Sequence, residues 1–197
     1  MTENKFDLTS RRGVLKAGGV LAASLPVASY AQVNGSSEIK VALVGCGGRG
    51  TGAASQTLTS GGTKLVAVAD AFRNTAESVV KRLKEKFPKQ VDVPDERIFD
   101  GFDAYREAID AADVVILATT PGFRPYHFEY AVEKGKHVFM EKPVATDAPG
   151  IRKVLEVAKK ADEKNLKVVC GLQRHYQNSY LETLEQVKKG VVGDLIS

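Results

Sequence analysis

The chain has 197 residues, which is enough for one domain and part of a second. Hydrophobic and charged residues make up 43% and 26% of it, ordinary fractions for a globular protein, and the net charge is +4. No basic stripe indicates a nucleic-acid-binding protein, and two cysteines are too few for a disulfide framework. We expect Cys46 and Cys170 to fill apolar space, and no spacing of His, Cys and Asp predicts a metal site.

The N-terminal segment is predicted to be a targeting sequence rather than part of the fold. Residues 10–16 (SRRGVLK) resemble the twin-arginine export motif, and the mildly apolar run that follows is too short for a transmembrane span. Small residues then precede Gln32 at positions typical of a cleavage site. We expect a signal peptide at residues 1–31, a linker at 32–38 and a periplasmic mature protein that is not bound to the membrane. A disordered basic tail is the alternative.

A glycine-rich loop follows the first predicted strand. Residues 39–44 (IKVALV) are a short apolar run rich in β-branched residues, which is typical of a strand buried on both faces. The next six residues, GCGGRG, have the G-x-G-x-x-G spacing, in which the glycines allow a tight turn, close approach of a pyrophosphate and close packing of the next helix. That helix offers free N–H groups to phosphates. The candidate diphosphate-binding residues are Gly45, Gly47, Gly48, Arg49 and Gly50.

The second predicted strand, residues 64–69, ends in an acidic residue at the spacing of a dinucleotide-binding site. Asp70 lies twenty residues after Gly50, where a carboxylate binds the hydroxyls of the adenosine ribose. Asp70 favours NAD because it repels the 2′-phosphate of NADP, but Arg73 could bind that phosphate, so NADP stays open. The alternative is a plain strand–turn–helix in which Asp70 only caps the helix.

The rest of the chain alternates helices with strands. The expected helices cover residues 72–87, 103–111 (capped by Asp103), 124–134, 147–165 (opened by Asp147) and 179–189, and the expected strands cover residues 97–99, 113–118, 137–140 and 168–170. This alternation predicts an α/β fold, a Rossmann-type doubly wound parallel sheet with helices on both faces. We assign residues 39–171 to this domain and residues 172–197 to the start of a second domain.

Ligands of doubly wound sheets bind at the carboxyl ends of the strands, so the residues that follow the strands are the next candidates. These residues are Thr119, Thr120 and Pro121, then Glu141, Lys142 and Pro143, and finally Arg174 and His175. His127 lies on the expected helix near the first group, and a lone histidine there is at least as well explained by packing as by function.

Together these motifs resemble the Gfo/Idh/MocA family, which includes glucose–fructose oxidoreductases and inositol dehydrogenases. The likeness covers about residues 38–196 and rests on the glycine loop with Asp70, Thr120-Pro121 with His127, and residues 135–138 (GKHV) running into Glu141-Lys142-Pro143. It implies an N-terminal Rossmann domain and a C-terminal α/β domain whose large sheet supplies much of the sugar site. Members are about twice this length. The chain therefore looks like the cofactor half of a longer, exported member that forms homo-oligomers.

The resemblance also implies roles for the strand-end residues. Lys142 is the catalytic candidate because hydride transfer needs a group that manages the proton of the substrate hydroxyl. Without the resemblance, a lysine in a turn is more simply a surface residue. The remaining candidates would contact the cofactor: Thr119, Thr120, Pro121, His127, Glu141, Pro143 and Arg174. In the family, an aromatic-x-Pro sequence usually follows this arginine, and that sequence is absent after Arg174. The substrate contacts in this region therefore stay open.

We therefore expect a nicotinamide-nucleotide-dependent oxidoreductase that transfers a hydride to or from a small molecule, namely a sugar, a polyol or a sugar derivative. Two alternatives stay open. One is an NAD-dependent glycoside hydrolase similar to the α-N-acetylgalactosaminidases, which regenerate their NAD in each cycle. The other is a nucleotide-binding fragment that is inactive without a second domain.

Overall fold

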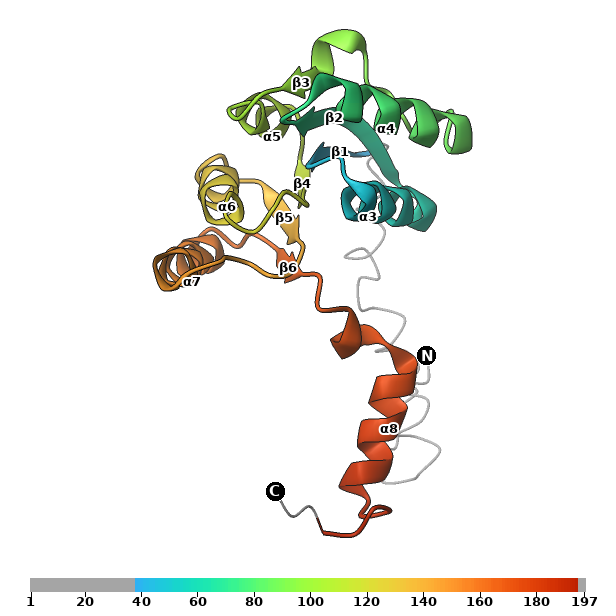
Figure 1. The fold of residues 1–197 in the computed structure, drawn as a ribbon, viewed down its shortest axis with the longest axis vertical. Coiled ribbons are helices and arrows are strands. Elements are labelled where there is room, and N and C mark those ends of the chain that lie inside the picture. Colours follow the sequence, from blue (N-terminus) through green and yellow to red (C-terminus); the bar gives the residue numbers. More distant parts are fainter. Residues whose placement is uncertain (1–37, 195–197) are drawn as a thin grey trace, which may run out of the picture. The chain divides into compact units, whose positions relative to one another are not determined.

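The structure, a computed structural model, describes residues 38–194 (Figure 1). The predicted signal peptide and nearly all of the predicted linker lie outside the described residues. Within residues 38–194, no helix has the length and apolar character needed to span a membrane.

The fold is built on one sheet of six parallel strands. The strands are β1 (Ile39–Val44), β2 (Thr63–Asp70), β3 (Ile98–Asp100), β4 (Val114–Leu117), β5 (His137–Met140) and β6 (Val168–Cys170). Their order in the sheet is β3-β2-β1-β4-β5-β6, so the direction of winding reverses between β1 and β4. This order is that of the Rossmann fold, and the reversal marks the crevice where such sheets bind dinucleotides. The predicted Rossmann-type parallel sheet is confirmed.

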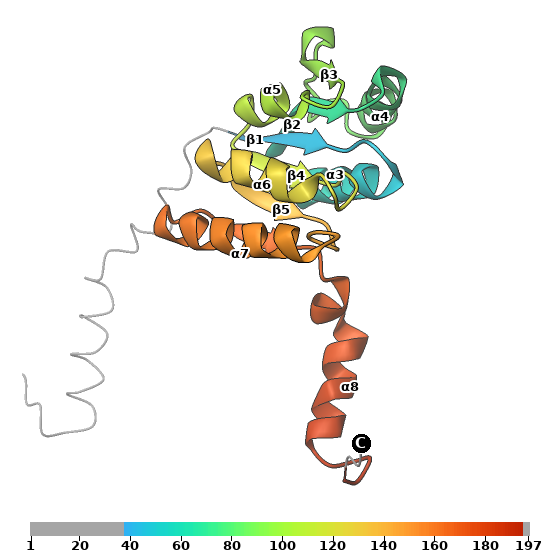
Figure 2. The same cartoon turned by 60° about the vertical axis from the view of Figure 1, so that its left-hand side comes forward.

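Helices cover both faces of the sheet (Figures 1 and 2). The covering helices are α3 (Gly48–Ser60), α4 (Arg73–Lys86), α5 (Tyr105–Asp110), α6 (Arg124–Glu133) and α7 (Ala148–Glu163). The described residues also include the short 3-10 turns η1 (Asp95–Arg97) and η2 (Gln173–Tyr176) and a further helix, α8 (Asn178–Lys188), which has no residue in either apolar cluster. One apolar cluster joins α3 and α4 to the sheet, and a second joins α5, α6 and α7 to its opposite face. Within β1, Val41 and Leu43 belong to the first cluster, whereas Ala42 and Val44 belong to the second, as expected for a strand buried on both faces.

The two helix caps proposed from the sequence have different outcomes. Asp147 caps α7, since its Oδ1 accepts a hydrogen bond from the Gly150 N–H at 2.7 Å. The prediction that Asp103 caps the next helix is wrong, because α5 begins only at Tyr105 and no side chain caps it. The Asp103 carboxylate lies 3.5 Å from Nε of Arg106, the second residue of that helix, instead.

Candidate active site

The glycine loop packs too closely against its surroundings for side chains at two of its positions. Gly45 has a φ of +97°, and a Cβ added there would lie 2.4 Å from the backbone N of Thr119. A Cβ added at Gly50 would lie 2.0 Å from the carbonyl oxygen of Gly45. Gly45 therefore allows the turn out of β1 against the end of β4, and Gly50 lets α3 pack directly on the loop, as its spacing predicts.

The other two glycines of the loop leave open space at the start of α3. A Cβ added at Gly47 or Gly48 would meet no atom within 4 Å. The helix begins at Gly48, and no side chain caps it. Its first-turn N–H groups are thus free to bind an anion, and the partial positive charge of the helix end favours one. This arrangement fits the diphosphate of a dinucleotide.

Asp70 joins the end of β2 to the glycine loop. Its Oδ2 accepts a hydrogen bond from the Cys46 N–H at 2.7 Å, and its Oδ1 accepts one from the Phe72 N–H at 3.1 Å. Asp70 is not the cap of α4, because Phe72 holds that position and no side chain bonds to the helix end. Each carboxylate oxygen can accept a further hydrogen bond, so Asp70 can bind ribose hydroxyls from where it lies.

The guanidinium of Arg73 is held by groups near β3. Its Nε pairs with Oε1 of Glu77 at 2.8 Å, and its Nη2 donates to the carbonyl of Asp95 at 3.1 Å. Its Nη1 donates to the carbonyl of Ile98 and lies 3.7 Å from Oδ1 of Asp100. These contacts engage all three guanidinium nitrogens.

A cavity of about 390 Å³ lies at the carboxyl ends of β1, β2 and β4. Residues from the glycine loop, Asp70, Thr119 and Thr120 line it, together with the rings of Phe102 and Phe123. The two rings are stacked with their centroids 5.8 Å apart. A cavity that combines aromatic walls, a carboxylate and an uncapped helix end suits the adenosine and diphosphate of a nucleotide.

His127 forms part of the cavity wall as a neutral side chain. It is 5% exposed, its Nδ1 lies 3.2 Å from Oγ1 of Thr119, and its ring stacks on Tyr105 with a centroid distance of 4.1 Å. Burial lowers the pKa of His127 to about 4, and two nearby arginines lower it further in the same direction. The imidazole is thus uncharged at neutral pH and packs between aromatic rings.

Glu141 connects the end of β5 to the first turn of α3. Its side chain is buried, and its Oε1 accepts a hydrogen bond from Nε of Arg49 at 2.7 Å. Gly171, after β6, leaves room for this carboxylate, since a Cβ there would lie 2.9 Å from Oε1 of Glu141. Two candidates from distant parts of the sequence therefore form one ion pair.

The remaining candidates lie outside the cavity. Lys142 and Pro143 are exposed and lie two and three residues after the end of β5, and Pro121 follows Thr120 without lining the cavity. We call residues 119–121 and 141–143 the β4–β5 edge. Arg174 lies on η2, where its guanidinium stacks on Tyr180 at 4.6 Å.

The structure contains one buried charge that the sequence analysis did not select. Arg124 is 2% exposed and donates hydrogen bonds to the carbonyls of Thr119 and Pro143. The sequence did contain a signal, because a cation at the first position of a helix opposes the helix dipole and requires another explanation.

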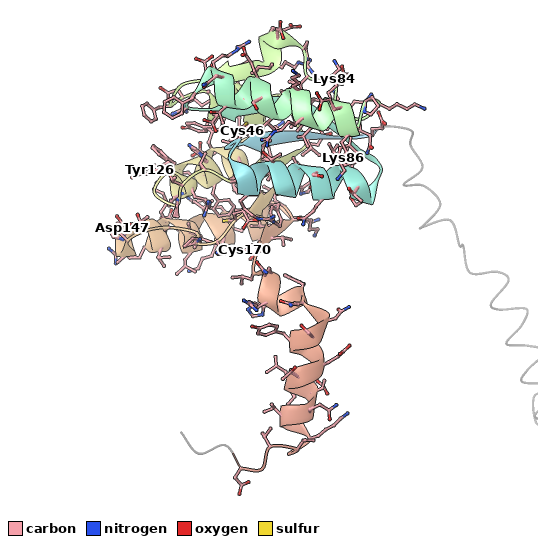
Figure 3. All side chains as sticks on the ribbon, turned by 45° about the vertical axis from the view of Figure 1, so that its right-hand side comes forward. Cys46, Lys84, Lys86, Tyr126, Asp147 and Cys170 are labelled. Atoms are coloured by element: carbon pink, nitrogen blue, oxygen red, sulfur yellow. The ribbon has the colours of Figure 1, made fainter. Side chains whose placement is uncertain are left out.

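The two cysteines are free and pack as predicted (Figure 3). Cys46 is buried in the core, and burial together with the charge of Asp70 raises its pKa to about 12. Cys170 is partly buried and packs against the second apolar cluster. Among residues 38–194, no group of three or more His, Cys, Asp and Glu side chains is placed to bind a metal ion.

Comparison with known proteins identifies relatives both by sequence and by structure. Inositol 2-dehydrogenase from Serratia proteamaculans is 31% identical over 137 residues, which cover 68% of this chain and 36% of that protein. Glycosyl hydrolase family 109 protein 1 from Shewanella sp. (strain ANA-3) is 28% identical over 212 residues, which cover 94% and 44%. The crystal structure of myo-inositol 2-dehydrogenase from Lactobacillus plantarum superimposes with a TM-score of 0.64 at 24% identity, over 81% and 44% of the two chains.

This chain spans less than half of the length of each of these three relatives. The family model described as "Oxidoreductase family, NAD-binding Rossmann fold" matches residues 39–169, which is more than half of the chain. The glycine loop, Asp70 and both segments of the β4–β5 edge all lie inside that match. The chain therefore belongs to the Gfo/Idh/MocA oxidoreductase family and carries its NAD-binding Rossmann fold.

Proposed function

We propose that this chain is the cofactor-binding part of an oxidoreductase that transfers a hydride between NAD and a sugar, a polyol or a sugar derivative. The observation that carries the proposal is the uncapped start of α3 beside the Asp70 carboxylate, in a cavity at the reversal point of the sheet. Similarity to inositol dehydrogenases supports the substrate class. Residues 172–197 would begin the domain that binds the substrate, and the exposed Leu181 and Leu184 of α8 are consistent with this role.

NAD is the proposed cofactor rather than NADP. A 2′-phosphate on the adenosine ribose would lie beside the negative charge of Asp70. Arg73 is the cation nearest in sequence, and its guanidinium is already engaged by Glu77 and by two backbone carbonyls. A phosphate would have to displace these contacts before it could bind Arg73.

The proposed roles of the site residues follow the order of the strands in the sheet. The N–H groups of the glycine loop hold the diphosphate, and Asp70 holds the adenosine ribose. The other half of the cofactor then extends over the ends of β4 and β5, where Lys142 would hold or release the proton of the substrate hydroxyl. When bound, the nicotinamide cofactor supplies the hydride acceptor or donor.

Calorimetric titration of the purified protein with NAD and NADP separately tests this proposal. We expect NAD to bind more tightly, and Asp70→Ala to weaken NAD binding by about tenfold while weakening NADP binding less. The matched variant Arg73→Met should leave NADP affinity unchanged within about twofold. Absence of binding to either nucleotide, or an equal loss of both in Asp70→Ala, would contradict the assignment.

An NAD-dependent glycoside hydrolase is the second candidate, because the family 109 relative aligns with 94% of this chain. The two activities differ in what happens to the cofactor. An oxidoreductase accumulates NADH with its substrate, whereas such a hydrolase releases sugar and regenerates its NAD. Absorbance of NADH, measured with inositols and with α-N-acetylgalactosaminides, separates the two. A protein that binds NAD but turns over neither class of substrate would be the non-catalytic fragment.

We further propose that the protein is exported by the twin-arginine route to the periplasm and that the whole protein forms homo-oligomers. The export proposal rests on residues 10–16. Replacing Arg11 and Arg12 with lysines should retain the protein in the cytoplasm, as measured by cell fractionation. An unchanged distribution would overturn it.

A further inference from the structure

Arg124 occupies a position that stability alone does not explain. It begins α6, is 2% exposed, and its Nε is buried without a hydrogen-bond partner among the described residues. A buried guanidinium with an unsatisfied donor costs free energy. Its place at the start of a helix also opposes the helix dipole. Such a residue is commonly retained at a functional site.

The two hydrogen bonds that Arg124 does form reach two different strands. Its Nη2 donates to the carbonyl of Thr119, two residues after β4 ends, and its Nη1 donates to the carbonyl of Pro143, three residues after β5 ends. These carbonyls belong to the two segments of the β4–β5 edge. The planar guanidinium presents donors in fixed directions, so it can join two acceptors that a single ammonium cannot hold together in the same way.

A compensating negative charge comes from Glu141 in the same edge. Burial lowers the pKa of Arg124, and the negative charge of Glu141 opposes that shift. Glu141 in turn pairs with Arg49 in the first turn of α3. The β4–β5 edge is therefore connected to α6 through the buried Arg124, and to the glycine loop through the pair of the buried Glu141 with the half-exposed Arg49.

The topology indicates which half of the cofactor this edge would meet. The glycine loop follows β1 and Asp70 ends β2. With the diphosphate on the loop and the adenosine ribose at Asp70, the rest of the molecule has to extend away from β2, over β4 and β5. Thr119 and Pro143 mark the two segments that this half would cross.

We propose that Arg124 is a positioning residue that fixes the spacing between the two segments of the β4–β5 edge, so that the nicotinamide half of the cofactor binds in one orientation. The inference rests on the proposed NAD-binding function. It assigns to Arg124 a role in binding the nicotinamide end and none in binding the adenosine end.

The affinities for two ligands distinguish binding of the nicotinamide end from binding of the adenosine end. NADH contains the nicotinamide ring, whereas ADP-ribose has the same adenosine, diphosphate and second ribose without the ring. We expect Arg124→Met to weaken NADH binding by about tenfold and to change ADP-ribose binding by less than about twofold. Arg124→Lys should fall between, because one ammonium replaces two directed donors. The control Arg152→Met removes an exposed arginine of α7 and should change neither affinity.

The fluorescence of bound NADH gives a second readout that a general loss of stability would not move. Emission depends on the surroundings of the reduced ring, so at saturation the spectrum of Arg124→Met should move toward that of free NADH. Equal loss of both ligands, or no loss of either, would overturn the inference. If Arg124→Met does not fold, the affinities of Arg124→Lys for NADH and for ADP-ribose test the inference in the same way. Failure of the unaltered protein to bind either ligand would instead refute the proposed function itself, and the inference with it.

Discussion

The two sides of the crevice are built by different means. The side formed by the glycine loop and Asp70 depends on backbone geometry: two glycines at positions without room for a Cβ, and one carboxylate bound to backbone N–H groups. The β4–β5 edge depends on two buried charges: Arg124 bonds to one carbonyl in each of the two segments of the edge, and Glu141 pairs with Arg49, 92 positions away in the sequence. The first side leaves a recognisable spacing in the sequence, whereas the second depends on pairs of groups that no spacing indicates.

The largest effect should come from the backbone-built side. Gly50→Ala would place a Cβ 2.0 Å from the carbonyl oxygen of Gly45, so α3 or the loop must move. We expect a loss of about 3 kcal/mol or more in the free energy of unfolding, measured by urea denaturation. Gly48→Ala is the matched control, because its Cβ meets nothing within 4 Å, and it should change stability by less than about 1 kcal/mol. Equal effects would show that the close packing is not what requires Gly50.

The stability of the protein should depend on pH because of His127, which lies in the cavity wall between the two sides. The pKa of His127 is about 4 in the folded protein against 6.5 as its ordinary value, so the unfolded chain binds more protons between these values. Stability is therefore complete above about pH 6.5 and is lost as the pH falls toward 4, by up to about 3 kcal/mol. Denaturation midpoints across this range should fall less steeply in His127→Gln. The exposed His175, replaced in the same way, should leave the slope unchanged.

The smallest effect should come from the ion pair that links the two sides. Arg49→Met leaves the buried carboxylate of Glu141 without its partner, at an expected cost of about 2 kcal/mol at pH 7. Lys160→Met breaks the pair with Glu156, in which both side chains are more than half exposed, and should cost less than about 0.5 kcal/mol. Urea denaturation of both variants measures the difference. A cost for Arg49→Met as small as for Lys160→Met would show that the edge is not connected to α3 by this pair.

The parallel sheet and the glycine loop could both be predicted from the sequence, for a physical reason. A strand buried on both faces reads as a continuous apolar run, and the six-residue glycine pattern is recognisable from its spacing, although the close contact that requires Gly45 is made with Thr119. Asp70 was found because its distance from Gly50 is set by one helix and one strand. Each of these features leaves a pattern of residue types or spacing in the sequence, even where its contacts are made between distant residues.

The β4–β5 edge could be predicted only in part. Glu141 and Lys142 were selected because they follow a strand, but the pairing of Glu141 with Arg49 joins residues 92 positions apart. Arg124 was passed over because a helix that begins with arginine looks solvent-exposed until its acceptors are known. Asp103 failed as a cap because the chain makes a further bend before α5 begins. These outcomes depend on where distant segments meet, which periodicity does not encode.

The thiol in the middle of the glycine loop has a chemical consequence. Burial and the charge of Asp70 raise the pKa of Cys46 to about 12, so its thiol stays protonated at neutral pH. Oxidants and alkylating agents react with the sulfur anion, so this cysteine is inert although it lies next to the nucleotide cavity. The loop can therefore keep its shape in a compartment where exposed thiols would be oxidised.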